Sequence, residues 1–115
     1  MTEPEYERFE WQSREDLVKA LSSNDAQRIR DALYSAAQYE SDWEWSEAQS
    51  LKFLNHKEFN VRWAAALSLG FIALYQHRLN LDKVLPELQA AKKDNLLAPH
   101  VEDSLDMIRQ YIRTN

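Results

Sequence analysis

The sequence predicts an all-α fold of about six helices, and three observations support this prediction. The 115 residues include a single glycine and three prolines, so few positions suit tight turns or left-handed backbone. The stretches between them are dominated by Ala, Leu, Glu, Lys, Arg and Gln, which favour helices. Apolar residues recur at spacings of three and four, which places them on one face of a helix. With 44% apolar residues, the chain can supply the core of one domain over residues 1–115.

The chain is expected to begin with an arm and a short helix. Residues 1–12 show neither a helical nor a strand period, so we interpret them as an N-terminal arm ahead of helical repeats over residues 13–112. Ser13 opens a capping box, a common start signal of helices. The apolar residues that follow at helical spacing are Leu17, Val18 and Leu21. They predict a short first helix.

Two further helices are expected before residue 57. Each is preceded by candidate N-caps, which are Asn24 or Asp25 and then Ser41 or Asp42. The predicted buried stripes are Ile29, Ala32, Leu33, Ala36 and Ala37 in the second helix, and Ala48, Leu51 and Leu54 in the third. We expect the second helix to end near Tyr39 and the third near His56.

The fourth helix is expected to form the centre of the fold. Asn60 is its candidate cap, and its apolar residues from Val61 onward cover every side, which is typical of a helix surrounded by others. The small residues Ala64–Ala66 and Gly70 would let neighbouring backbones come close. The apolar stretch over 61–75 is shorter than the roughly 20 residues that a membrane span requires, which favours a buried helix.

Two helices are expected in the last third of the chain. The fifth starts near Asp82, and Pro86 is tolerable there because it falls in or near the first turn. Pro99 is well placed to open the sixth helix. The predicted buried residues are Val84, Leu85 and Leu88 in the fifth helix, and Val101, Leu105, Ile108 and Ile112 in the sixth.

Composition and charge exclude several classes of function. The absence of cysteine excludes disulfides, thiol nucleophiles and zinc–thiolate sites, and it permits a reducing cytoplasm. Residues 1–10 carry four Glu and no apolar run, so we expect no secretory signal, no membrane association and a cytoplasmic location. Residues 1–58 hold 13 acidic and 7 basic residues (−6), while the remainder holds 6 and 7 (+1). An acidic protein is a poor match for nucleic acid, so we expect a basic protein partner.

The residue types that usually carry catalysis are sparse. None of His56, His77 and His100 has an acidic residue three positions earlier or a second histidine four positions away, so helical metal pairs are absent from the sequence. The lone Gly70 lies within a predicted helix and cannot form a phosphate-binding loop. We therefore expect no enzymatic activity, no metal and no cofactor.

The helices recur in pairs, and the sequence repeats itself weakly. Residues 29–32 align with residues 61–64, and residues around Val101 align with residues around Val61. The segment 58–72 (Glu-Phe-Asn-Val-Arg-Trp-Ala-Ala-Ala-Leu-Ser-Leu-Gly-Phe-Ile) resembles the HEAT-repeat pattern of an acidic turn, Val-Arg, paired alanines, Leu-Gly and an aliphatic residue. Weaker copies flank it, as terminal repeats would. The resemblance implies a short HEAT-like α-solenoid of antiparallel helix pairs, with Arg62 in an ion pair or on a loop carbonyl.

The run over residues 39–47 (Tyr-Glu-Ser-Asp-Trp-Glu-Trp-Ser-Glu) joins three aromatic residues to four acids. In a helix Trp43 and Trp45 point about 200° apart, so we expect one of them near the surface. Tyr and Trp are enriched at interface hot spots, and surrounding carboxylates would steer a basic partner. The predicted partner-binding residues are Tyr39, Glu40, Asp42, Trp43, Glu44, Trp45 and Glu47. In the alternative, this helix buries two faces and both rings are structural.

A helical module this short, acidic and rich in aromatic residues also resembles the immunity proteins that bacteria make against their own toxins, including those of contact-dependent growth inhibition. This resemblance implies a protein that neutralises a cognate basic toxin, a nuclease for example, by binding and occluding it. The alternative is a HEAT-like adaptor or scaffold without an inhibitory role. Both interpretations describe a protein that works by binding another protein.

Overall fold

The computed structural model describes residues 9–112, and six helices in this range confirm the all-α fold. They are α1 (Arg14–Leu21), α2 (Ala26–Tyr39), α3 (Trp43–Phe53), α4 (Phe59–Gln76), α5 (Leu81–Ala91) and α6 (Ala98–Tyr111). The expected arm is described from Phe9 onward, and its earlier residues lie outside the described range. No helix between residues 9 and 112 is long and apolar enough to cross a membrane.

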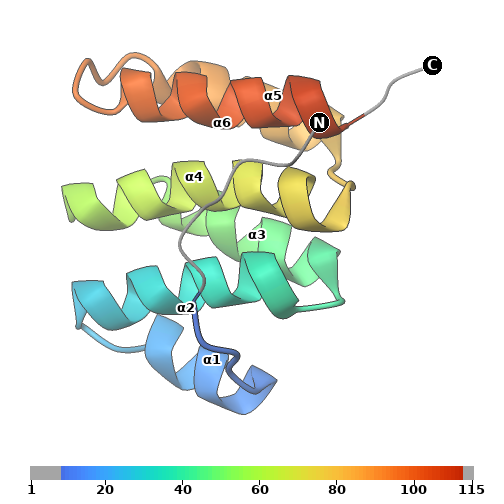
Figure 1. Cartoon of the computed structure of the whole chain (residues 1–115). Coiled ribbons are helices and arrows are strands. Elements are labelled where there is room, and N and C mark those ends of the chain that lie inside the picture. Colours follow the sequence, from blue (N-terminus) through green and yellow to red (C-terminus); the bar gives the residue numbers. More distant parts are fainter. Residues whose placement is uncertain (1–8, 113–115) are drawn as a thin grey trace.

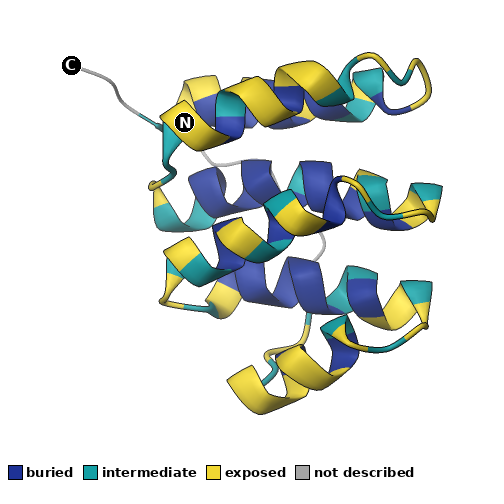
Figure 2. Ribbon diagram, turned by 180° about the vertical axis from the view of Figure 1, so that it is seen from behind, coloured by how far each residue is buried: buried dark blue, intermediate teal, exposed yellow. Residues whose placement is uncertain are grey.

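The helices are stacked in an order that puts α4 at the centre. In Figure 1, α2, α4 and α6 form a row on one side, and α3 and α5 lie behind it. Within this row α4 packs against α2 and α6, and it also contacts α3. Figure 2 shows the outer side from behind, where α3 and α5 expose much of their surface while α2 and α4 are mostly buried. The prediction that the fourth helix is surrounded by others is confirmed.

The apolar core has two parts. The main part surrounds α4, whose Val61, Leu69 and Ile72 are fully buried. A smaller cluster lies between α1 and α2 and includes Leu17 and Ala32. Burial of apolar surface in the main part provides most of the driving force for folding.

Three of the predicted N-caps are present. The Ser13 hydroxyl accepts a hydrogen bond from the backbone N–H of Asp16, and Asp25 accepts from the backbone of the first turn of α2. The Asp42 carboxylate accepts from the backbone N–H of Trp45 at the start of α3. Each cap satisfies backbone donors that a helix start leaves free, which explains why these helices begin where they do.

The start of α4 differs from the prediction. Asn60 is not its cap, because the helix begins at Phe59 and follows Glu58, whose side chain makes no capping bond. The Glu58 carbonyl instead accepts from the N–H groups of Val61 and Arg62, both at 3.1 Å. The start of α4 is therefore fixed by backbone hydrogen bonds and not by a side-chain cap.

Arg62 fulfils both roles that the HEAT resemblance implied. Its Nη1 donates to the carbonyls of His56 at 2.9 Å and Lys57 at 3.0 Å. Its Nη2 pairs with Asp94 at 3.5 Å. The side chain therefore ties the loop before α4 to the connection between α5 and α6.

The structure differs from three expectations for α3 and α5. The buried face of α3 consists of Ser46, Glu47, Ser50 and Phe53, while Ala48 of the predicted stripe is exposed. The helix also ends at Phe53, before His56. Pro86 is the sixth residue of α5, beyond the first turn. Because proline has no backbone N–H, it cannot donate the helical hydrogen bond to the carbonyl of Asp82, and both residues lie on the exposed side of α5.

Gly70 lies at a close approach of α4 to α6. A Cβ atom added at this residue would lie 2.5 Å from Cε of Met107 and 3.0 Å from Cα of Ser104. A side chain at this position would displace Met107 and press on the backbone of Ser104, so the crossing of the two helices favours glycine here.

Candidate functional site

The predicted site residues lie where α2 ends and α3 begins, in a segment that we call the acidic corner (residues 39–47). Tyr39 is the last residue of α2, and it is 38% exposed. The side chain of Asp42 is 54% exposed, although it caps α3. Glu44, in the first turn of α3, is exposed. These three side chains are accessible to a partner.

The two tryptophans of the acidic corner pack on different sides of α3. Trp43 contacts the main core, and Trp45 contacts the small cluster between α1 and α2. Both are partly buried, so neither is the surface residue that the sequence led us to expect. This is the two-faced burial described by the alternative interpretation.

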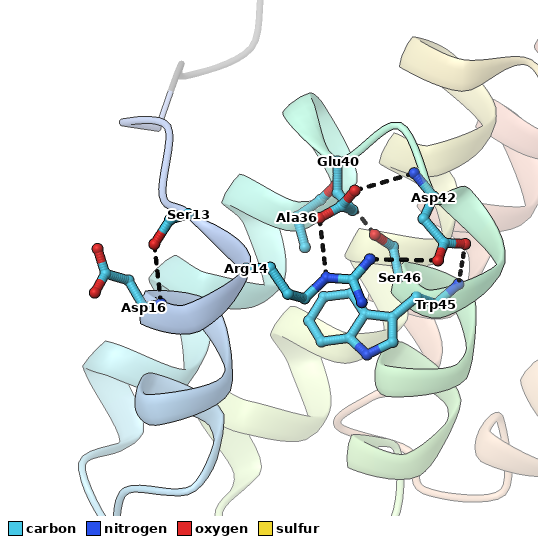
Figure 3. A network of polar contacts seen from close by, with 8 residues as sticks. All are labelled: Ser13, Arg14, Asp16, Ala36, Glu40, Asp42, Trp45 and Ser46. Carbon is cyan, nitrogen blue, oxygen red and sulfur yellow. Dashed lines mark hydrogen bonds and ion pairs between the residues drawn. The ribbon is translucent and has the colours of Figure 1, made fainter.

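Arg14 of α1 holds the acidic corner together, as Figure 3 shows. Its Nε donates to Glu40 at 3.1 Å, and its Nη2 donates to Asp42 at 3.3 Å. Its Cζ lies 4.0 Å from the ring centroid of Trp45, in a cation–π contact. The hydrogen bond from Arg14 lowers the pKa of Glu40 from its usual value. No local sequence pattern pointed to Arg14, because 26 residues separate it from Glu40.

Glu47 is not part of the exposed site. Its side chain is buried, with 3% of the residue exposed. One carboxylate oxygen accepts from the backbone N–H of Asn80 at 2.6 Å, and the other accepts from the Asn80 side chain at 2.8 Å. Glu47 therefore ties α3 to the start of α5, and its expected place among surface carboxylates is corrected.

The charges of the acidic corner are partly compensated within the chain. Glu40 and Asp42 share the guanidinium of Arg14, whereas Glu44 makes no ion pair within residues 9–112. The exposed acids Glu15 and Asp16 lie in the first turn of α1, beside Arg14. The corner thus presents a net negative surface with one exposed aromatic ring, which suits binding of a cationic surface.

A second aromatic surface, absent from the predictions, lies on α4 and α6. Trp63 is 36% exposed, and its ring stacks on that of His100 with a centroid distance of 4.0 Å. Phe59 lies beside both rings, at 6.1 Å from Trp63 and 6.3 Å from His100. One sequence signal was available, since Trp63 is a large aromatic residue directly before the small residues Ala64–Ala66.

This second surface borders a groove of about 550 Å³ between the arm, α2 and α4. Its lining residues are Phe9, Ala26, Gln27, Arg30, Tyr34, Asn60 and Trp63. We call it the aromatic groove. The backbone N–H of Phe9 donates to the side chain of Gln38 at 3.0 Å, which fixes the arm against α2.

The histidines make structural contacts. Nδ1 of His56 accepts from the backbone N–H of Glu58 at 3.0 Å, and His77 ends α4 in the left-handed region at a φ of 59°. Such left-handed residues are common just after a helix. Within residues 9–112, no three His, Asp or Glu side chains are grouped closely enough to hold a metal ion.

Comparison with solved structures finds the same fold in another protein. A chain in the crystal structure of a CDI complex from Cupriavidus taiwanensis matches this protein with a TM-score of 0.83. The two sequences are 24% identical, and the match covers 95% of this chain and 98% of the other. Protein-family profiles and curated proteins give no match. The structural likeness shows that the two chains share the fold.

Proposed function

We propose that this protein is an immunity-type protein that neutralises a cognate toxin of a contact-dependent growth inhibition system by binding it. The observation that supports the proposal most is the fold shared, over nearly the whole of both chains, with a chain of a CDI complex. The short, acidic, helical chain fits the same role. Binding is then the whole mechanism, with no catalytic step, and the protein acts in the cytoplasm of the cell that it protects.

In this proposal the acidic corner faces the toxin. Glu44 makes no ion pair within residues 9–112, and it lies in the first turn of α3, near the positive end of the helix dipole. Tyr39 supplies a ring with a hydroxyl, a side chain that is common at interface hot spots. Asp42 is exposed beside them. A basic toxin domain, such as a nuclease that binds phosphates, matches this surface in charge, and occlusion of its active site explains neutralisation.

The proposal is tested by growth protection and by binding. If the gene immediately upstream encodes a toxin-like C-terminal domain, that domain is expressed with and without this protein, and the affinity of the purified pair is measured at two salt concentrations. We expect the wild-type protein to protect the cells and bind the domain. Absence of binding refutes the proposal. Binding without protection indicates the alternative, a HEAT-like adaptor.

A pair of charge reversals tests the location of the site. Glu44→Lys and Glu87→Lys change the net charge equally, and both residues are exposed without an ion pair in the described range. We expect Glu44→Lys to weaken toxin binding by about tenfold to a hundredfold, mainly through the association rate, whereas Glu87→Lys has little effect. Equal effects of the two variants would show that the acidic corner is not the interface.

A further inference from the structure

Aromatic rings from three segments of the chain converge on the aromatic groove. Phe9 of the arm lies 4.8 Å from Tyr34 of α2, measured between ring centroids. Trp63 of α4 also lines the groove. Its ring is held by stacking on His100. The position of Tyr34 is fixed as well, since the residue is buried and its ring contacts Phe71 edge-on at 5.4 Å. The groove is therefore preformed, which lowers the cost of binding.

The charge of the aromatic groove indicates what it holds. Among residues 9–112, Arg30 is the only charged residue that lines it, and its guanidinium already binds Asp31, with distances of 3.1 Å and 2.9 Å. Its Cζ also lies 5.8 Å from the centroid of Phe9, where a bound cation would otherwise sit. A charged side chain entering the groove would lose its water without gaining a free countercharge. The matching occupant is an uncharged apolar side chain.

Two side-chain amides at the groove suit a polypeptide backbone. Gln27 of α2 and Asn60 of α4 both line the groove and are exposed. Neither amide group makes a hydrogen bond within residues 9–112. Each side-chain amide can both donate and accept a hydrogen bond, and a backbone peptide group can do the same. The amides therefore provide recognition that is independent of the side chains of the occupant.

We propose that the aromatic groove binds an extended segment of a partner protein. A large uncharged apolar side chain of that segment lies among Phe9, Tyr34 and Trp63, while Gln27 and Asn60 hold its backbone. Assignment of the segment to the toxin rests on the proposed function. In that case the groove is a second contact, which adds buried apolar area to the charge complementarity of the acidic corner.

The chemistry of the groove is tested without the toxin. Blocked pentapeptides Gly-Gly-Xaa-Gly-Gly, with Phe, Leu, Lys or Glu at the centre, are titrated into ¹⁵N-labelled protein. We expect the Phe and Leu peptides to shift the NMR signals of the Trp63 indole and of the Gln27 and Asn60 amides, and the Lys and Glu peptides to leave them unchanged. The absence of a shift with Phe refutes the proposal, as does a stronger response to Lys.

Matched variants connect the groove to the partner. Trp63→Ala and Leu96→Ala each remove an exposed apolar side chain, and Leu96, which is 74% exposed, does not line the groove. We expect Trp63→Ala to weaken both Phe-peptide and toxin binding, the latter about 30-fold, and Leu96→Ala to weaken neither. Asn60→Ala replaces an exposed side chain, so the fold is not disturbed. We expect it to weaken binding less than Trp63→Ala does.

The outcomes separate the two proposals. Normal toxin binding by Trp63→Ala overturns the assignment of the groove to the toxin. If the wild-type protein does not bind the toxin, the proposed function is overturned. The peptide titration then still tests whether the groove binds an uncharged apolar side chain.

Discussion

The substitution Gly70→Ala tests the packing of α4 against α6. In a helix exposed to solvent, this change stabilises the folded state by about 1 kcal/mol, because alanine has the higher helix propensity. In this protein the new Cβ would lie 2.5 Å from Cε of Met107 and 3.0 Å from Cα of Ser104. The Met107 side chain can move aside, but the contact with Ser104 involves backbone, so α6 itself must shift.

The expected magnitude follows from these two opposing effects. Overpacking a well-packed core costs about 1–3 kcal/mol. After the gain in propensity is subtracted, we expect Gly70→Ala to lower the free energy of unfolding by roughly 1 kcal/mol. For a domain of this size that corresponds to a fall in Tm of about 4 °C.

Urea denaturation followed by circular dichroism at 222 nm measures this change. The background Met107→Ala supplies the control, because it removes the nearer of the two contacts. We expect Gly70→Ala to cost less in that background than in the wild-type protein, which gives a coupling free energy between the two sites. An increase of about 1 kcal/mol in stability on Gly70→Ala would refute the argument, since it would mean that α4 and α6 leave room for a methyl group.

Two further predictions concern the contacts around α3. Glu47→Ala should lower the free energy of unfolding by about 2–3 kcal/mol in urea denaturation, because the buried carboxylate accepts both hydrogen bonds from Asn80, and Glu47→Gln should cost less. Arg14→Ala should lower stability at pH 7 and make it less dependent on pH in acid. Because folding lowers the pKa of Glu40, its carboxylate stabilises the folded state at pH values above the pKa that it has in the unfolded chain. This stabilisation is lost as the pH falls through the pKa of Glu40 in the folded state. The gap between the urea midpoints of wild type and Arg14→Ala should therefore narrow as the pH falls below the usual pKa of Glu, and a constant gap would contradict the role of Glu40.

The parts of the fold that depend on neighbouring residues were predictable from the sequence. Caps act within three residues, so Ser13, Asp25 and Asp42 could be recognised directly. The all-round apolar character of α4 likewise identified the central helix. Such features need no knowledge of what lies opposite in the folded chain.

The buried face of α3 could not be predicted in the same way. Apolar periodicity assumes that buried residues are apolar, yet α3 buries Ser46 and Glu47. The Ser46 hydroxyl donates to the carbonyl of Ala36 at 3.2 Å, and Glu47 accepts from Asn80, 33 residues away. Because these partners compensate the loss of water, polar residues can be buried here, whereas the apolar pattern pointed to Ala48, Leu51 and Leu54.

The candidate site also combines features that the local sequence predicts with features that depend on the folded chain. The composition of residues 39–47 drew attention to the acidic corner, but the pairing of Glu40 and Asp42 with Arg14 depends on the position of α1 in the fold. Trp63 and Phe9, far apart in the sequence, line one groove only because Phe9 is held against α2. Local patterns therefore identified residues whose chemistry suits binding, and the fold determines which of them remain accessible to a partner.

The two proposed surfaces would contribute differently to binding. The acidic corner carries exposed charge at Glu44 and Asp42, and charges at the rim of an interface act mainly on the association rate, in a salt-dependent manner. The aromatic groove is neutral and preformed, so an apolar side chain held by Trp63 would act mainly on the dissociation rate, with little dependence on salt. A protein that must intercept a toxin before it acts needs rapid capture, and one that must keep it inactive needs slow release. Surfaces of two kinds on one small helical chain can meet both requirements, because each rate is set by a different group of residues.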